Sequence, residues 1–341
     1  MAEQGTHKPL AGGSNPPSAT TPTPLDELAA ALDDGARAVD LPPDADFVLA
    51  VSGGPDSMAL LRGAARLVET DTSHWRVTVA HLDHALRAGS ADDAAFVADA
   101  AAALRLPFES RRTDVAALAR GEGRSIEDAG REARYRFLEE VAPDGAWIAT
   151  AHTADDAAET VLLNLLRGSG LGGVRGIPAR RGRVVRPLLG HRRETLRALL
   201  DAAGVAYRID PSNDDPAHLR NRVRNEVLPL LEELRPGAVD RIGRFARLAA
   251  DDDSLLDELA AAELARRTTP DGAIDWHDTP AAGLDRRILR MAIGQPAPSA
   301  ERIEALVEAA SGDRGGVRIE LGAGRSASVR GRRIRIERGP S

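Results

Sequence analysis

The chain of 341 residues is long enough for about two domains, and its hydrophobic content of 43% is ample for their cores. Its formal net charge of -7 argues against a protein that binds nucleic acid indiscriminately. No run of about 18 uncharged apolar residues occurs, so a transmembrane helix is not expected.

Cysteine is absent and lysine nearly so. The lack of cysteine excludes disulfides, zinc-thiolate sites, iron–sulfur clusters and persulfide transfer as chemistry carried by this chain. The one lysine, Lys8, lies in residues 1–24, which are rich in Pro, Gly, Ser and Thr and are predicted to be a disordered tail. A Schiff base or a Walker-type phosphate clamp is therefore not expected. The tail has no apolar centre of a signal peptide, which predicts a cytoplasmic protein.

Strands and helices alternate through the first two thirds of the chain. Such alternation predicts right-handed crossovers and an α/β fold with a doubly wound parallel sheet over about 40–215. The expected strands are 46–51, 75–82, 107–115 and 146–152, and the expected helices are 56–68, 90–106, 125–142 and 153–168.

The pattern changes after residue 216. A helix is expected over 219–234, ended by the Arg-Pro-Gly sequence at 235–237. Further helices are expected near 239–265, 284–293 and 300–310, followed by short strands in the glycine-punctuated 315–339 segment. We therefore expect a catalytic domain over 25–216, a linker helix over 217–240 and a smaller α+β domain over 241–341.

The sequence VSGGPDS, residues 51–57, joins the first strand to its helix. Gly53 and Gly54 let backbone N–H groups approach an anion, and the helix N-terminus adds its dipole. The carboxylate of Asp56 would repel a phosphate unless a cation lay between them, which indicates magnesium. A tight turn with a capping aspartate is the structural alternative. The spacing excludes a dinucleotide fingerprint, and the lack of lysine excludes a Walker A loop.

Two further polar clusters follow later strands. HLDHALR, residues 81–87, ends the second strand and places Asp83, His84 and Arg87 at the edge where open parallel sheets bind ligands. HTADDAAET, residues 152–160, follows the fourth strand and contains His152, Asp156 and Glu159. Asp156 and Glu159 share a helix face and could complete a magnesium site or hold a cationic amine. The alternative for this segment is an acidic first helical turn favoured by the helix dipole.

Arginine is concentrated in a few segments. Solvated surface charge and contact with a polyanion both explain these clusters, and the sequence leaves the choice open. For Arg220, Arg222 and Arg224, the alternatives are phosphate contact and salt bridging with Glu226. The other two clusters comprise Arg175, Arg180, Arg181, Arg183, Arg186, Arg192, Arg193 and Arg197, and the arginines of 314–338.

The loop SGGPDS resembles the PP-loop of the ATP pyrophosphatase family, which cleaves ATP between its α and β phosphates. Six segments in this order resemble the tRNA(Ile)-lysidine synthetase family, across about half of the chain. They are SGGPDS, HLDHALR, IEDAGREARYRFL, HTADDAAETVLLNLLRGSGLGGVRGIP, VRPLL and DPSNDD followed by LRNRVRNEVLP. The departures are Gly130 for an expected Ala, Thr153 for a common His and Ala157 for a common Gln, none of them assigned to the chemistry.

The resemblance implies an adenine nucleotide alpha-hydrolase-like fold and a ligase reaction. ATP adenylates the C2 oxygen of the first anticodon cytidine in an isoleucine tRNA with the anticodon CAU. The amine of free lysine then displaces AMP, so that decoding changes from AUG to AUA and tRNA identity from Met to Ile. Implied partners are ATP, Mg²⁺, free L-lysine and this tRNA, with no membrane. A homodimer is left open.

The resemblance also implies roles for particular residues. The ATP-binding residues would be Ser52, Gly53, Gly54, Pro55, Asp56 and Ser57. The catalytic residues would be Asp56, Asp83, Arg131, Arg134, His152, Asp156 and Glu159, with Asp56 and Asp156 as the magnesium ligands. The tRNA-binding residues would be His84, Arg87, Arg175, Arg186, Arg220, Arg222 and Arg224.

Three other functions use similar features. A tRNA thiolase shares the adenylation but needs sulfur carried by cysteine or a cluster, and the chain has no cysteine. An ammonia-using synthetase acting on a small molecule is a second alternative, although no glutaminase domain is visible. A nucleotide-sensing or tRNA-binding module with a degenerate loop is the third, and the complete set of polar residues argues against it.

Overall fold

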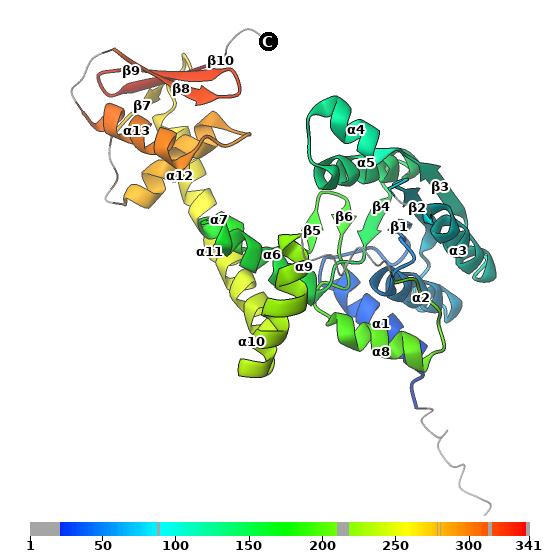
Figure 1. The fold of residues 1–341 in the computed structure, drawn as a ribbon. Helices are drawn as coiled ribbons and strands as arrows, with labels where there is room; N and C mark the ends of the chain where they lie inside the picture. Colours follow the sequence, from blue (N-terminus) through cyan, green and yellow to red (C-terminus); the bar gives the residue numbers. More distant parts are fainter. Residues whose placement is uncertain are drawn as a thin grey trace, which may run out of the picture. The chain divides into compact units, whose positions relative to one another are not determined.

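The fold is described by a computed structural model covering residues 21–86, 89–209, 218–277, 279, 281–312 and 316–338 (Figure 1). The chain divides into two compact units. Unit 1 comprises Met1–Ala157 and Pro178–Ala217, and unit 2 comprises Ala158–Ile177 and His218–Ser341. Most of the tail expected over 1–24 lies outside the described residues. Within it, Thr23 caps the first helix, α1 (Pro24–Arg37), by accepting a hydrogen bond from the backbone of Asp26.

Unit 1 is built on a six-stranded sheet with the order β3-β2-β1-β4-β6-β5. All neighbours are parallel except β5 and β6. Because β1 lies between β2 and β4, the strand order reverses there, and this switch point is where open α/β sheets bind ligands. The strands are β1 (Asp46–Ala50), β2 (Arg76–Asp83), β3 (Phe108–Arg112), β4 (Trp147–Thr150), β5 (Arg180–Arg181) and β6 (Val184–Val185).

Helices cover both faces of this sheet (Figure 1). Alternate residues of β1 point to opposite faces, so Phe47 and Leu49 pack into one core and Val48 into the other. The first core is closed by α1, α2 (Pro55–Glu69), α3 (Ser90–Ala103) and α8 (Arg193–Ala202). The second is closed by α4 (Val115–Glu122) and α5 (Ile126–Val141), and Ser125 caps α5 by accepting from the Asp128 N–H.

One glycine allows an unusually close contact in this layer. A Cβ atom at Gly35 of α1 would lie 1.7 Å from the carbonyl oxygen of Pro187. Only glycine lets α1 approach the chain between β6 and α8 so closely. This contact fixes the segment that leads into α8.

Unit 2 has a helical part and a small α+β part. Helix α6 (Ala154–Leu166) begins in unit 1 and continues into unit 2, where Val161 packs with Val174, Ala246 and Ala249. The other helices of this part are α7 (Leu171–Val174), α9 (Leu219–Arg222), the π-helical segment η2 (Val223–Val227), α10 (Leu228–Leu234) and α11 (Ala238–Arg267).

The α+β part packs two helices on an antiparallel sheet with the order β7-β10-β9-β8. Ile288, Leu306 and Val329 are fully buried between these layers. The elements are α12 (Ala282–Ile293), α13 (Ala300–Ser311), β7 (Ile274–Asp275), β8 (Val317–Gly322), β9 (Arg325–Arg330) and β10 (Arg333–Arg338). The expected parallel sheet and the smaller α+β part at the C-terminal end are thus confirmed. Among the described residues, no helix combines the length and apolar character needed to cross a membrane.

Candidate functional site

The loop after β1 has the backbone geometry of an anion site. Gly53 has a φ of +88°, a conformation that L side chains rarely adopt, and Gly54 caps α2 with no side-chain hydrogen bond. The first N–H groups of a helix lack partners within the helix and favour negative charge. The start of α2 therefore presents these groups beside the carboxyl end of β1.

Hydrogen bonds fix this loop from within and from β2. The Ser57 hydroxyl donates to the carbonyl of Gly54 at 2.9 Å and accepts from the Ser52 N–H at 3.2 Å. His81 on β2 bonds the carbonyl of Val51 through Nδ1 at 2.8 Å. His81 is buried, so this histidine of the HLDHALR segment supports the loop.

Asp156 lies in the first turn of α6, directly after β4. Its Oδ2 accepts from both the N–H and the hydroxyl of Thr153, at 2.9 and 3.0 Å. These bonds cap the helix and hold the carboxylate in one orientation. The structural role anticipated for the acidic turn is therefore present, and it uses one of the two carboxylate oxygens.

The other oxygen of Asp156 meets Asp56 at a shared arginine. Nε of Arg193 donates to Oδ2 of Asp56 at 2.9 Å, and its Nη2 donates to Oδ1 of Asp156 at 2.8 Å. One guanidinium therefore joins two carboxylates that are 100 positions apart in the sequence. Arg193 stands in a run of arginines with no motif that distinguishes it from its neighbours.

Asp155 fixes the backbone from which Arg193 extends. Helix α8 has no side-chain cap from its own N-cap residue. Asp155 supplies one instead, because its Oδ2 accepts from the backbone N–H of Arg193 at 2.8 Å. Arg192 lies 3.5 Å from the same oxygen. Asp155 therefore binds the backbone of Arg193, and the adjacent Asp156 binds its side chain.

The donor set formed by Asp56 and Asp156 fits magnesium. Mg²⁺ in nucleotide sites takes one or two carboxylates, and substrate phosphates and water complete its coordination. Across the described ranges, no three His, Cys, Asp or Glu side chains form a cluster that could hold a metal by themselves. Two convergent carboxylates beside an anion-binding loop match a cation that arrives with its nucleotide.

His152 and Asp83 follow β4 and β2. Nδ1 of His152 and the hydroxyl of Thr150 share a hydrogen bond at 2.9 Å. Asp83 is buried, and its Oδ1 accepts from the Ala85 N–H at 2.8 Å while Arg112 lies 3.5 Å from its Oδ2. Burial alone would raise the pKa of Asp83, but the bond from Ala85 and the charge of Arg112 hold that pKa below its ordinary value.

His84 contacts Arg134 of α5. Nη2 of Arg134 lies 3.2 Å from Nε2 of His84, and because arginine only donates, Nε2 is the acceptor. Burial and the charge of Arg134 lower the pKa of His84 to about 4, so His84 is neutral at neutral pH. Arg131 lies over the ring of Tyr135, 5.1 Å from its centroid. Arg87 lies outside the described residues.

Glu159 forms a separate cluster within unit 2. It is fully buried and accepts from Nε of Arg220 at 2.9 Å and from Nε and Nη2 of Arg224 at 2.6 and 2.9 Å. Two guanidinium groups therefore surround one carboxylate. Glu159 is a partner of Arg220 and Arg224 that the sequence pattern does not predict.

The remaining arginines assigned to tRNA differ in exposure. Arg222 pairs with Glu226 at 3.1 Å, as the salt-bridge alternative has it. Arg175 is half exposed and lies 3.2 Å from Asp253 of α11. Arg186 is 3% exposed and donates to the carbonyl of Pro178 at 2.7 Å, which favours a structural role.

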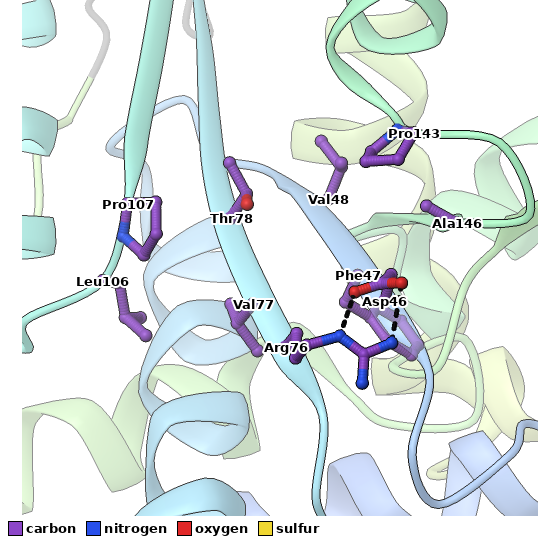
Figure 2. A pocket seen from close by; sticks show the side chains of 10 residues that line it. All are labelled: Asp46, Phe47, Val48, Arg76, Val77, Thr78, Leu106, Pro107, Pro143 and Ala146. Atoms are coloured by element: carbon purple, nitrogen blue, oxygen red, sulfur yellow. Dashed lines mark hydrogen bonds and ion pairs between the residues drawn. The ribbon is translucent and has the colours of Figure 1, made fainter.

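A pocket of about 290 Å³ lies at the opposite, amino-terminal edge of the sheet (Figure 2). Its rim includes Asp46 and Arg76, the first residues of β1 and β2, which form a two-bond ion pair at 2.5 and 2.8 Å. The charges at this edge therefore neutralise each other. The chemistry-bearing residues of unit 1 gather at the carboxyl edge instead.

The parallel sheet of unit 1 and the loop 52–57 define the class of protein, which is that of the PP-loop domain. The family model of the PP-loop domain matches residues 27–231, which include all the strands of the parallel sheet and the convergent pair Asp56 and Asp156.

Curated relatives narrow the class further. A tRNA(Ile)-lysidine synthase of Salinispora tropica is 45% identical over 245 residues, which cover 69% of this chain and 72% of the relative. One of Geobacter sulfurreducens is 46% identical over 258 residues, covering 72% of this chain and 54% of the relative. The chain belongs to the tRNA(Ile)-lysidine synthase family. It spans about half the length of several curated relatives that it matches.

A solved structure supports the fold alone. The U34-tRNA thiolase NcsA from Methanococcus maripaludis, with its [4Fe-4S] cluster, matches with a TM-score of 0.53 and 15% identity. The match covers 67% of this chain and 79% of that one.

Proposed function

We propose that this protein joins free L-lysine to C2 of the first anticodon cytidine of an isoleucine tRNA with the anticodon CAU, using ATP and releasing AMP and diphosphate. The observation that carries the proposal is the meeting of Asp56 and Asp156 beside loop 52–57, at the switch point of the sheet. The family membership supports the choice of tRNA and lysine.

The first step forms an adenylated tRNA. The C2 oxygen of cytidine attacks the α-phosphorus of ATP, the bond to the bridging oxygen breaks, and diphosphate leaves. The N–H groups of loop 52–57 and the start of α2 would bind the phosphates. Asp56 and Asp156 would hold Mg²⁺, which neutralises charge on the diphosphate. Arg131 or Arg134 would stabilise charge on the α-phosphate or bind the base.

The second step forms the carbon–nitrogen bond. The neutral ε-amine of lysine attacks C2, AMP leaves with the C2 oxygen, and the nitrogen loses a proton. Carboxylates are suited to hold the amine and receive this proton, and we assign Asp83 and Glu159 to that task. His152 would contact phosphate or transfer a proton. Adenylation is what makes the C2 oxygen a good leaving group.

Arginine side chains would bind the tRNA backbone. Their guanidinium groups match phosphate geometry, and the scarcity of aromatic residues, 3%, argues against broad stacking platforms. The assigned arginines are Arg87, Arg175, Arg220, Arg222 and Arg224, joined by His84, with 241–341 as the recognition domain. The product would read AUA instead of AUG and carry isoleucine identity. A cytoplasmic location is a further prediction.

Labelled ATP tests the reaction class. Full-length protein is incubated with α-labelled ATP, with and without lysine and the CAU-anticodon tRNA, and the nucleotide products are separated. We expect AMP and diphosphate in amounts that depend on the tRNA. ADP, or AMP formed equally well without tRNA, would contradict the proposal.

A further inference from the structure

We infer that Arg193 holds the place of the nucleotide-bound cation between Asp56 and Asp156, and that its guanidinium moves to a phosphate group of ATP when the nucleotide and its cation bind. This inference rests on the proposed use of ATP. It adds a positioning and phosphate-binding residue that lies outside the motifs of the family resemblance.

Arg193 and a bound cation compete for the same carboxylate oxygen atoms. Nε and Nη2 of Arg193 take Oδ2 of Asp56 and Oδ1 of Asp156, and the second oxygen of Asp156 is used to cap α6. A cation joining these two carboxylates must therefore take the oxygen of Asp156 that Arg193 now holds. Guanidinium and cation cannot share that position.

Arg193 also offsets the repulsion between the Asp56 and Asp156 carboxylates. Two carboxylates close enough to bind one guanidinium repel each other when no positive charge lies between them. Arg193 removes this repulsion before the nucleotide arrives, so the carboxylates are already convergent when the cation binds. The same contact should lower the affinity for a cation without nucleotide, because that cation must first displace Arg193.

The backbone of Arg193 is held in place while its side chain is partly exposed. Asp155 holds the Arg193 N–H at the start of α8, and the side chain retains 22% exposure. The Asp56 side chain is 21% exposed as well. Displacement therefore needs only a change of side-chain rotamer and leaves the helix in place.

The displaced guanidinium of Arg193 would find a phosphate close by, at the start of α2. Asp56 is the second residue of α2, so a guanidinium bonded to Asp56 already lies beside the helix start that would bind phosphate. Arginine binds phosphate through two parallel hydrogen bonds. Exchange of a carboxylate for a phosphate oxygen keeps the guanidinium paired throughout.

Two binding constants measured on full-length protein test the inference. The first is the dissociation constant of Mn²⁺ alone, by electron paramagnetic resonance of free Mn²⁺. The second is that of α,β-methylene-ATP at saturating Mg²⁺, by calorimetry. The variants are Arg193→Ala and Arg193→Lys. Arg197→Ala is the matched control, because Arg197 lies one turn along α8 and pairs with Tyr207 at 2.9 Å. Thermal unfolding verifies that each variant is folded.

We expect the two constants to move in opposite directions. Arg193→Ala should bind Mn²⁺ about tenfold more tightly and the nucleotide about tenfold more weakly, the size expected for one charge-assisted hydrogen bond. Both dissociation constants of Arg193→Lys should lie between those of wild type and Arg193→Ala, because lysine keeps the charge but lacks the two parallel donors of a guanidinium group. The control should match wild type.

If Arg193 only maintained the structure, its replacement would weaken the binding of both Mn²⁺ and the nucleotide. If Arg193 had no role at the site, neither dissociation constant would change. Both results overturn the inference. Wild-type protein that binds the nucleotide as described but leaves tRNA unmodified would contradict the proposed function and leave this inference standing.

Discussion

Arg224 donates hydrogen bonds to both carboxylate oxygens of Glu159, with Nε 2.6 Å from Oε1 and Nη2 2.9 Å from Oε2. The carboxylate is fully buried, whereas the side chain of Arg224 keeps 25% exposure. A buried carboxylate needs such partners because desolvation of an unpaired charge is costly. An incoming ammonium group could take over this pairing, which is the basis for assigning Glu159 to lysine.

Replacement of Glu159 by Gln should separate the two chemical steps. The variant loses the negative charge that would hold the lysine ammonium, so lysine incorporation should fall by about a hundredfold or more. Formation of diphosphate should continue, since it needs only ATP and tRNA. The measurement is incorporated labelled lysine against diphosphate released in one reaction. Equal loss of both products would contradict the assignment.

The same substitution should lower stability. Two guanidinium groups lose their charged partner, and the free energy of unfolding should drop by about 1–3 kcal/mol in urea titrations. Arg222→Ala provides the control, because the Arg222–Glu226 pair is more than half exposed on both sides. Its removal should change the free energy of unfolding by less than about 1 kcal/mol.

The two glycines of the loop should respond differently to alanine. Gly53 has a φ of +88° and its added Cβ would touch Phe96 and Val97 at 3.4 Å. Gly53→Ala should therefore destabilise the protein by about 1–2 kcal/mol. Gly54 has a φ of -73°, and a Cβ there meets only ordinary contacts, the nearest at 3.6 Å. Gly54→Ala should melt near wild type, and equal melting shifts would contradict this reading of the loop.

Asp56 and Asp156 should each be required for AMP formation. Replacement by Asn keeps the size of the side chain but removes a charged ligand, and stabilisation by a metal ion is worth several kcal/mol. AMP release should fall by about a hundredfold or more in either variant. Glu194→Gln is the control, an exposed acidic residue beside Arg193. Turnover at the wild-type rate in the Asn variants would remove both residues from the site.

His84 predicts a pH dependence of stability. Its folded pKa of about 4 lies below the ordinary 6.5, so between these values the unfolded chain binds a proton that the folded chain does not. The free energy of unfolding should fall as pH is lowered through this window, by at most about 1.4 kcal/mol per pH unit from this group. His84→Gln keeps an acceptor for Arg134 and should show a shallower slope in urea titrations. Equal slopes would contradict a histidine that stays neutral in the folded protein.

Local sequence was sufficient for much of the fold. The four expected strands and their helices are present because alternating apolar segments and caps such as Ser125 are local signals. Strands β5 and β6 have only two residues each, too short for a periodicity to show. Helix α8 begins among arginines, where the sequence shows a basic cluster and no capping residue that marks the helix start.

The site could be predicted only in part, because its partners come from distant segments. The family resemblance predicts Asp56 and Asp156 as ligands of one magnesium ion, and the structure joins both to Arg193, which is 137 positions from Asp56. Burial cannot be read from a charge pattern either, which is why the sequence predicts Arg186 among the tRNA-binding arginines although its side chain is buried in unit 1. Charge patterns identify residue types, whereas pairing depends on the folded chain.

Incorporation of lysine into tRNA is the most direct test of the proposed ligase reaction. Full-length protein, ATP, Mg²⁺ and labelled L-lysine are incubated with an isoleucine tRNA transcript carrying the anticodon CAU, and with a transcript whose first anticodon base is uridine. We expect labelled RNA only from the first transcript, with the label on a nucleoside equal in mass to cytidine plus lysine less water. Unlabelled RNA, or equal labelling of both transcripts, would contradict the proposed reaction.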